Sequence, residues 1–156
     1  MTVQLSYNKA KLSKNETTVC TVTIATDKPA ESAVIEIIPS VEKYPEMVII
    51  PDSATPTASG GLQANAEMGE NGIFTITLPS TGSQTEFSVS FDAASAGFTD
   101  NNTSAAMVSV YRGGNVYEAY SQTYVSGKSP MSIGIAAALL TAAAAVTFYR
   151  IFLHSR

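Results

Sequence analysis

The chain has 156 residues, of which 45% are hydrophobic and 14% are charged, and its formal net charge is −4. This length predicts one domain with a sizeable core, and the lack of excess Lys and Arg disfavours nucleic acid as a partner. A single cysteine excludes a disulfide framework, and one histidine without any tryptophan leaves few groups for metal or nucleophilic chemistry, so we expect no cofactor and no metal site.

Residues 1–125 are predicted to form one all-β domain, an Ig-like β-sandwich of seven to eight strands. Apolar and polar residues alternate, and Thr, Val, Ile and Tyr are enriched, which is typical of strands. The expected strands cover residues 3–7, 17–24, 33–37, 48–50, 74–78, 87–91, 106–110 and 116–124. Cys20 falls on the inward side of the second strand, and we expect a small buried hydrophobe rather than a reactive thiol.

Turn signals separate these strands at residues 27–29, 70–72 and 112–115. The last of them lies between two strong strands, so residues 105–125 are predicted to form a β-hairpin. The Ser-, Thr-, Pro- and Gly-rich residues 51–61 are predicted to be a long loop. Residues 78–82 match the LPxTG pattern of sortase substrates, but they lie far from the terminal apolar segment, so we expect a turn there.

Four of the seven tyrosines are concentrated on the predicted hairpin. Tyr111, Tyr117, Tyr120 and Tyr124 are candidates for a contact face, because aromatic residues are enriched in protein interfaces. The alternative is that strand alternation turns half of them into the core.

Three asparagines begin triplets that match the glycosylation acceptor pattern: Asn15, Asn101 and Asn102. All three lie at predicted turns, where an acceptor would be accessible. The pattern has consequences only if the domain is exported into a glycosylating compartment.

Residues 131–149 are predicted to form one C-terminal transmembrane α-helix. They hold no charge and no proline, and 19 residues give roughly 28 Å of helix, which matches a hydrocarbon core about 30 Å thick. Residues 126–130 are a short linker before the helix, and residues 150–156 form a short basic tail after it. The alternative is a buried, alanine-rich helix of a soluble protein.

Small residues recur at every fourth position of this segment, at Gly134, Ala138 and Ala142. Such spacing lets two helix backbones approach closely, so we expect packing against a second copy or against another membrane helix. Chance is the alternative, because an alanine-rich segment produces this pattern easily.

The charge distribution orients the predicted span. All 13 acidic residues precede residue 129, whereas Arg150 and Arg156 follow the apolar segment. The positive-inside rule places these arginines in the cytoplasm and the body outside. Yet the opening residues show no secretory signal. Three explanations remain open: a processed chain, a tail-anchored protein with a cytoplasmic body, or insertion into the internal membrane of a virus.

Two stretches carry a resemblance to a known class of domain. Residues 11–24 pair a polar turn with a Thr/Val-rich strand, and residues 70–78 and 87–91 are two alternating strands joined by a Ser-rich turn. This pattern resembles prokaryotic Ig-like surface modules. The resemblance implies an Ig-like sandwich used for display, spacing or adhesion, and it carries over no functional residue. Antibody-type Ig domains differ, because Cys20 has no second cysteine and no tryptophan to pack against.

Together these patterns favour a non-catalytic, single-pass membrane protein that presents an Ig-like domain at the cell surface. The expected roles are adhesion, display or service as an accessory subunit of a membrane assembly. The expected partners are membrane lipid and a protein, or a second copy through the transmembrane helix. The alternative is a structural protein of a membrane-containing virion, anchored in the internal membrane. We do not expect an enzyme. The only histidine, His154, lies beyond the predicted span, so no Ser/His/Asp set can form on one side of the membrane.

Overall fold

The computed structural model describes residues 1–38, 49–52, 55–95 and 101–127. They form eleven strands and one short 3-10 turn: β1 Thr2–Tyr7, β2 Lys11–Leu12, β3 Thr17–Ala25, β4 Ser32–Ile38, β5 Ile49–Pro51, β6 Thr57–Ala58, η1 Ser59–Gly61, β7 Asn65–Met68, β8 Phe74–Leu78, β9 Glu86–Ser95, β10 Asn101–Arg112 and β11 Asn115–Gly127. The predicted all-β fold is confirmed.

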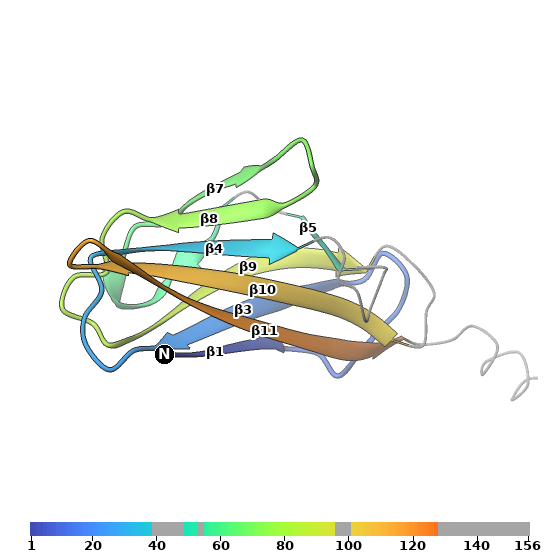
Figure 1. Cartoon of the computed structure of the whole chain (residues 1–156). Coiled ribbons are helices and arrows are strands. Elements are labelled where there is room, and N and C mark those ends of the chain that lie inside the picture. The colour runs from blue at the N-terminus through green and yellow to red at the C-terminus, as the bar shows by residue number, and fades with distance from the viewer. Residues whose placement is uncertain (39–48, 53–54, 96–100, 128–156) are drawn as a thin grey trace, which may run out of the picture.

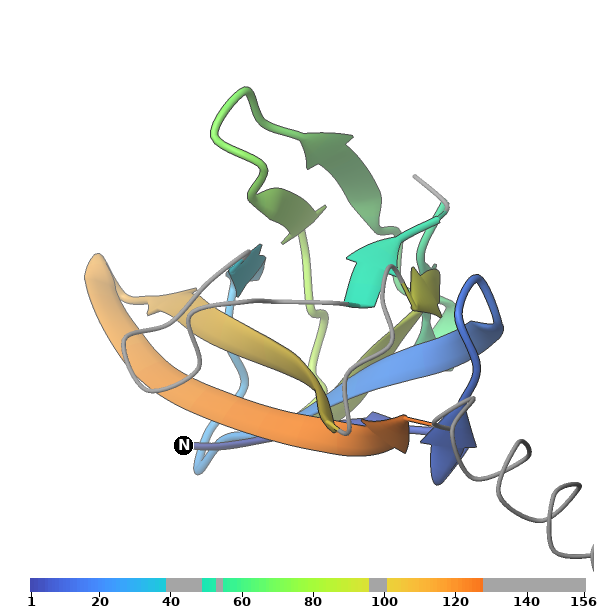
Figure 2. The ribbon, with the colours of Figure 1, turned by 90° about the vertical axis from the view of Figure 1, so that its right-hand side faces the viewer.

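The strands build two sheets that pack on each other as a sandwich (Figure 1). The five-stranded sheet has the order β1-β3-β9-β5, with β6 also paired to β9. The six-stranded sheet has the order β2-β11-β10-β4-β8-β7. The β10–β11 hairpin curves along one side of the sandwich, and β11 lies close to β1 of the other sheet (Figure 2).

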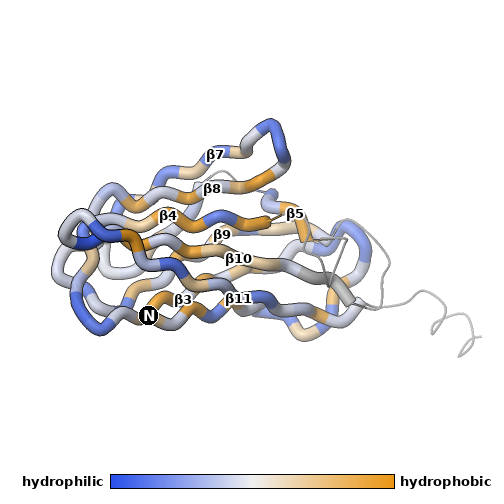
Figure 3. The backbone as a smooth tube through the Cα atoms, in the orientation of Figure 1, coloured by the Kyte–Doolittle hydropathy of each residue, from blue (hydrophilic) through white to orange (hydrophobic). Residues whose placement is uncertain are grey.

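One hydrophobic core fills the space between the sheets. Every second side chain of β3, from Thr18 to Ile24, is buried, and β4 and β8 show the same alternation. This interleaving of apolar and polar residues is visible along the strands in Figure 3. The rings of Phe74 and Phe91, which come from opposite sheets, meet with their centroids 5.4 Å apart. Removal of this apolar surface from water is the main source of stability.

All eight strands expected from the sequence are present, and three more accompany them. Strands β2 and β6 have two residues each, which is too short to show a period. Strand β7 is an edge strand with no buried side chain, so it carries no alternating pattern. The expectation of a long loop over residues 51–61 is corrected in part, since β6 and the 3-10 turn at Ser59–Gly61 lie within it.

The C-terminal predictions fall mostly outside the described residues. β11 continues to Gly127, two residues into the segment expected to be a linker. The predicted helix at residues 131–149, its packing residues Gly134, Ala138 and Ala142, and the basic tail at 150–156 lie outside the described part of the chain. Within that part, no helix has the length and hydropathy needed to cross a bilayer.

Candidate functional site

The candidate site is built on the β10–β11 hairpin, whose predicted position is confirmed. Twelve residue pairs join the two strands, from Asn101 opposite Ser126 to Arg112 opposite Asn115. The two-residue turn has Gly113 at φ +57° and Gly114 at φ +75°. Positive φ at both positions is the type I′ geometry that matches the twist of paired strands, and glycine adopts it without strain.

All four candidate tyrosines on this hairpin are exposed. The exposed fractions are 38% for Tyr111, 41% for Tyr117, 46% for Tyr120 and 61% for Tyr124. The alternative that half of them point into the core is therefore wrong. Near the turn neither face of β11 is covered, because the first four residues of this strand are all exposed.

Three of the tyrosines share the outer face of the six-stranded sheet. Val116 lies opposite Tyr111, and Tyr120 lies opposite Met107, so these side chains form alternate rungs on one face, with the Ser109–Glu118 pair between them. Tyr124 continues the same face, because residues 116, 120 and 124 are separated by even steps along β11. The outer face of the hairpin therefore presents exposed apolar and aromatic side chains that alternate along β11 with Glu118 and Gln122. These apolar and aromatic residues are called the strip: Tyr111, Val116, Tyr120 and Tyr124.

Tyr117 lies on the opposite face of β11, where the Arg112 side chain lies over its ring but leaves 41% of the residue exposed. The guanidinium carbon of Arg112 is 4.6 Å from the centroid of the Tyr117 ring, which is cation–π geometry. Arg112 Nη1 also lies 3.1 Å from Asp27 Oδ1 and donates to the carbonyl of Lys28. The hydrogen bond from Arg112 lowers the pKa of Asp27. One side chain thus ties the hairpin to the β3–β4 connection.

Glu31 fastens the hairpin turn from the same connection. Its carboxylate accepts a hydrogen bond from the Gly113 N–H at 3.0 Å, and its own N–H donates to the carbonyl of Tyr111 at 2.7 Å. Together with Arg112, these contacts hold the tip of the hairpin in one arrangement. A surface that is ordered beforehand loses less conformational entropy when it binds.

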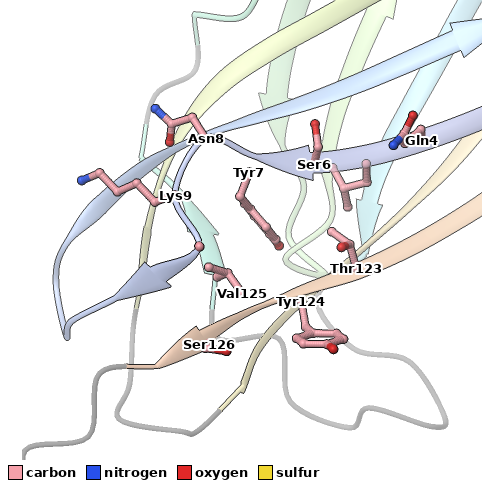
Figure 4. Close-up of a pocket in the computed structure, with 11 residues that line it drawn as sticks. Gln4, Ser6, Tyr7, Asn8, Lys9, Thr123, Tyr124, Val125 and Ser126 are labelled. Atoms are coloured by element: carbon pink, nitrogen blue, oxygen red, sulfur yellow. The ribbon is translucent and has the colours of Figure 1, made fainter.

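A groove of about 680 Å³ opens between β1 and β11 (Figure 4). One wall comes from residues 4–10 and the other from residues 123–126. The Leu5 N–H donates to Ser121 Oγ at one end, and the Ser126 N–H donates to the Ala10 carbonyl at the other. The volume suits a small ligand or a large side chain.

Tyr7 points into the space between these two strands (Figure 4). Its hydroxyl is buried and meets no partner in good hydrogen-bond geometry within the described residues. Burial raises the pKa of Tyr7, and the nearby Ser104 hydroxyl opposes only part of that rise. The ring of Tyr7 packs against the hydrophobic core, so Tyr7 forms part of the buried wall beside the groove.

The structure places the candidate glycosylation residues in two settings. Asn15 is exposed in the turn between β2 and β3, as expected, with φ +60° and its N–H bonded to the Ser95 carbonyl. Asn101 and Asn102 lie in β10, paired with Ser126 and Val125, and not in a turn. The turn preference of asparagine was overridden there by the long pairing with β11.

Two further sequence expectations are confirmed. Cys20 is fully buried in β3, and burial raises the pKa of its thiol, so the nucleophilic thiolate is disfavoured. The LPxTG-like segment is a turn that links β8 to β9, with Gly82 at φ +60°. Thr81 in this turn is fully buried, and its hydroxyl donates to the Ala30 carbonyl at 2.5 Å.

The residues that order the hairpin were not predicted from the sequence. Arg112 is 85 residues from Asp27, and Gly113 is 82 residues from Glu31. These residue types are common at turns, so nothing in a single sequence pairs them. Tyr7 was counted only as one member of an alternating strand. In the described part of the chain, no three His, Cys, Asp or Glu residues gather closely enough to hold a metal ion.

Comparison with known proteins supplies the fold but no family. No protein-family profile matches the sequence, and no curated protein sequence matches it. Solved structures do match. The collagen-binding subdomain of the Enterococcus faecalis surface protein ACE is similar, with a TM-score of 0.51 and 6% identity over 74% of this chain and 92% of that chain.

Two bacterial pilins are also similar in structure. The major pilin SpaD of Corynebacterium diphtheriae has a TM-score of 0.53 with 13% identity over 79% of this chain, and the major pilin subunit BcpA of Bacillus cereus has a TM-score of 0.53 with 11% identity over 82%. This chain spans only 34% and 40% of those pilins. The resemblance to prokaryotic Ig-like surface modules is thus confirmed at the level of the fold.

Proposed function

We propose that this chain is a non-catalytic surface protein that presents an Ig-like domain for adhesion. The observation that carries the proposal is the concentration of exposed aromatic and apolar side chains on one ordered hairpin. Of the seven exposed large hydrophobic residues among the described residues, five lie on β10 and β11. Tyrosine is enriched at protein interfaces because its ring is large, rigid and polar at one end.

A protein is the partner that best suits this surface. The strip of Tyr111, Val116, Tyr120 and Tyr124 is exposed, and the tip beside it is held by Arg112 and Glu31. Exposed aromatic side chains on an ordered surface are typical of protein interfaces. The similar domain of ACE is described as collagen-binding, which is a further reason to propose a protein ligand here.

The proposed anchor is the apolar segment at residues 131–149, with membrane lipid as its surroundings and the basic tail in the cytoplasm. β11 ends at Gly127, shortly before this segment, and its hairpin turn lies at the other end of the strand. Thirteen residues of strand span roughly 40 Å. The anchored end and the tyrosine-bearing tip would then face opposite ways. Gly134, Ala138 and Ala142 are proposed to pack this helix against a second copy or another membrane helix.

The experiment that tests this placement is protease protection on intact cells, with one epitope tag after Met1 and another after Arg156. We expect external protease to remove the first tag and to leave the second intact. A first tag that survives until the membrane is opened would overturn the surface placement. It would favour a cytoplasmic adaptor or a protein beneath a viral capsid.

A further inference from the structure

Among residues 1–38, 49–52, 55–95 and 101–127, strand β11 has one edge with no paired strand over most of its length. On one side β11 pairs with β10 throughout. On the other side β2 pairs only with Ser126 and Gly127. In the described part of the chain, the edge from Val116 to Tyr124 therefore pairs with no other strand. Strand β1 of the other sheet lies close to β11, and its Leu5 N–H donates to Ser121 Oγ.

The backbone groups at this edge follow from the hairpin geometry. A two-residue turn makes Arg112 and Asn115 a hydrogen-bonded pair, so the odd-numbered residues of β11 bond to β10. The even-numbered residues then turn their N–H and C=O groups outward. Ser126 agrees with this parity, because its N–H donates to the Ala10 carbonyl in the direction away from β10. Residues 116, 118, 120, 122 and 124 thus offer a ladder ready for another strand.

This edge lacks the features that normally prevent strand addition. Natural edge strands are protected by Lys, Pro, bulges or short length. Residues 116–124 contain no Lys, Arg or Pro, Glu118 is the one charge among them, and the pairing with β10 runs without a bulge. Val116, Tyr120 and Tyr124 are exposed along the same edge. An unprotected edge of nine residues is expected to be an interface.

We propose that β11 pairs antiparallel with β11 of a second copy of this chain, about a two-fold axis at Tyr120. Tyr120 is the midpoint of the unpaired stretch from Val116 to Tyr124, so this register uses the whole edge. An isologous contact of this kind closes after two copies.

Side chains on the outer face are complementary in this register. Tyr120 meets Tyr120 of the second copy, Val116 meets Tyr124, and Glu118 meets Gln122. Aromatic and aromatic–aliphatic pairs stabilise antiparallel strands, and no like charges oppose each other. Moving the axis from Tyr120 to Glu118, which slides one strand by four residues along the other, would bring Glu118 opposite Glu118 of the second copy, which is unfavourable.

On the face toward β1, the proposed register brings small side chains and a groove to the added strand. In the same register Ala119 lies opposite Ser121 of the second copy, and both are small where Leu5 approaches. Tyr117 of the second copy arrives opposite Thr123, which lines the groove between β1 and β11. The groove therefore lies beside the position that the ring of Tyr117 from the second copy would take. Tyr7 points into the same space.

Antiparallel pairing sets the direction in which the two chains leave the interface. Each Gly127 lies seven residues from the axis, so the two C-terminal ends of β11 point in opposite directions, roughly 45 Å apart. If each chain is anchored after β11, which rests on the proposed function, the two anchors belong to facing surfaces. The proposed partner in adhesion is then another copy of this chain on an opposing surface.

Cysteine substitutions in the full chain test the register. In a hydrogen-bonded antiparallel pair the Cα atoms are about 5.5 Å apart, within the range of a disulfide. We expect Tyr120→Cys to form a covalent dimer on mild oxidation, whereas Glu118→Cys or Gln122→Cys alone stays monomeric. An equal mixture of the last two should cross-link. The natural Cys20 does not compete because it is fully buried.

Two results would overturn this register. One is a Tyr120→Cys chain that stays monomeric under conditions that oxidise exposed thiols. The other is Glu118→Cys cross-linking to itself as readily as Tyr120→Cys does. Ile50→Cys, at an exposed apolar residue of the other sheet, measures the background of random collisions.

Bead clustering tests the pairing between surfaces. Beads that carry the full chain through its C-terminus should cluster, and Tyr120→Lys should abolish clustering because two lysines would meet on the axis. Beads with Tyr120→Lys and beads with Tyr120→Glu should cluster with each other but not with themselves. Met68→Lys on edge strand β7 is the matched control, and it should cluster like the unmodified chain.

Two results would overturn the self-pairing. One is that beads carrying the unmodified chain stay dispersed. The other is that beads with Tyr120→Lys and beads with Tyr120→Glu do not cluster with each other, although both variants unfold at the normal temperature. Either result leaves the proposed surface placement intact, because protease protection measures that placement without any second copy. Conversely, a cytoplasmic body would remove the opposing surfaces but would leave the cysteine cross-link unchanged. The two proposals therefore fail separately.

Discussion

Strands β3 and β11 are both rich in strand-favouring residues, but their roles are opposite. These residues are mainly Thr and Val in β3, and mainly Tyr and Val in β11. β3 lies between β1 and β9 and buries every second side chain, whereas β11 lies near the sheet edge and buries only Val125 fully. The apolar residues of β3 stabilise the fold, and those of β11 remain available for contacts. Position in the sheet therefore decides whether the strand-favouring residues are buried, as in the core strand β3, or remain exposed, as in the contact strand β11.

The largest effect should come from the core strand. Ile24 is fully buried in β3, so Ile24→Ala removes apolar contacts and leaves a cavity. We expect the free energy of unfolding to fall by about 3 kcal/mol, measured by urea denaturation of the full chain. Val19→Ala, at a partly exposed position on the other face of β3, is the matched control and should cost less than half as much. Equal losses would contradict the contrast between the two faces.

A second effect should come from the buried hydroxyl in the turn between β8 and β9. Thr81→Val keeps the shape of the side chain but leaves the Ala30 carbonyl without its donor. We expect a loss of about 1–2 kcal/mol, and Thr81→Ser should restore most of it. Ser80→Ala next to it tests an exposed hydroxyl, whose bond from the Gly82 N–H should matter little. A Thr81→Val chain as stable as the unmodified one would show that the buried bond contributes nothing.

How much of this fold the sequence predicts depends on the range of the interactions. The alternation in β3 and the two glycines at 113 and 114 are local signals, and both strand and hairpin were predicted from them. The hydrogen bond from the buried Thr81 hydroxyl to the Ala30 carbonyl joins residues that are 51 positions apart, and no local pattern predicts it. The candidate tyrosines were found by composition, but alternation alone wrongly left half of them in the core.

The same limit explains what was missed at the candidate site. Whether a strand lies at an edge depends on the order of strands in the sheet, and two-residue β2 has no sequence signature. Without that order, the unpaired edge of β11 is invisible. Arg112 and Asp27 are 85 residues apart, so their ion pair is equally hidden. Sequence patterns therefore predicted which residues form strands, but not which of those strands is left open.

A smaller, pH-dependent effect should come from the ion pair at the tip. The hydrogen bond from Arg112 lowers the pKa of Asp27. A lowered carboxyl pKa contributes stability above the ordinary Asp value of about 3.9, and that stability is lost as the pH falls through the lowered value. We expect Asp27→Asn to be less stable than the unmodified chain at pH 7 and equally stable near pH 2, as measured by thermal unfolding.

The control for this pair is Arg112→Gln, in which Asp27 loses its donor. In that background Asp27→Asn should change neither the unfolding temperature nor its dependence on pH. Because the pair is exposed, added salt should also reduce the difference at pH 7. A difference that persists unchanged at pH 2 would assign the effect to the shape of the side chain instead of its charge.

The smallest effect on stability should come from the contact strand. Replacing both Tyr120 and Tyr124 by Thr keeps the preference for strand structure and removes only exposed rings. We expect the free energy of unfolding to change by about 0.5 kcal/mol or less per residue, while bead clustering is lost. Thr75 and Thr77, on the partly exposed face of β8, show that threonine is compatible with this outer surface. A destabilisation as large as that of Ile24→Ala would mean that β11 contributes to the core after all, and the contrast between the two strands would fail.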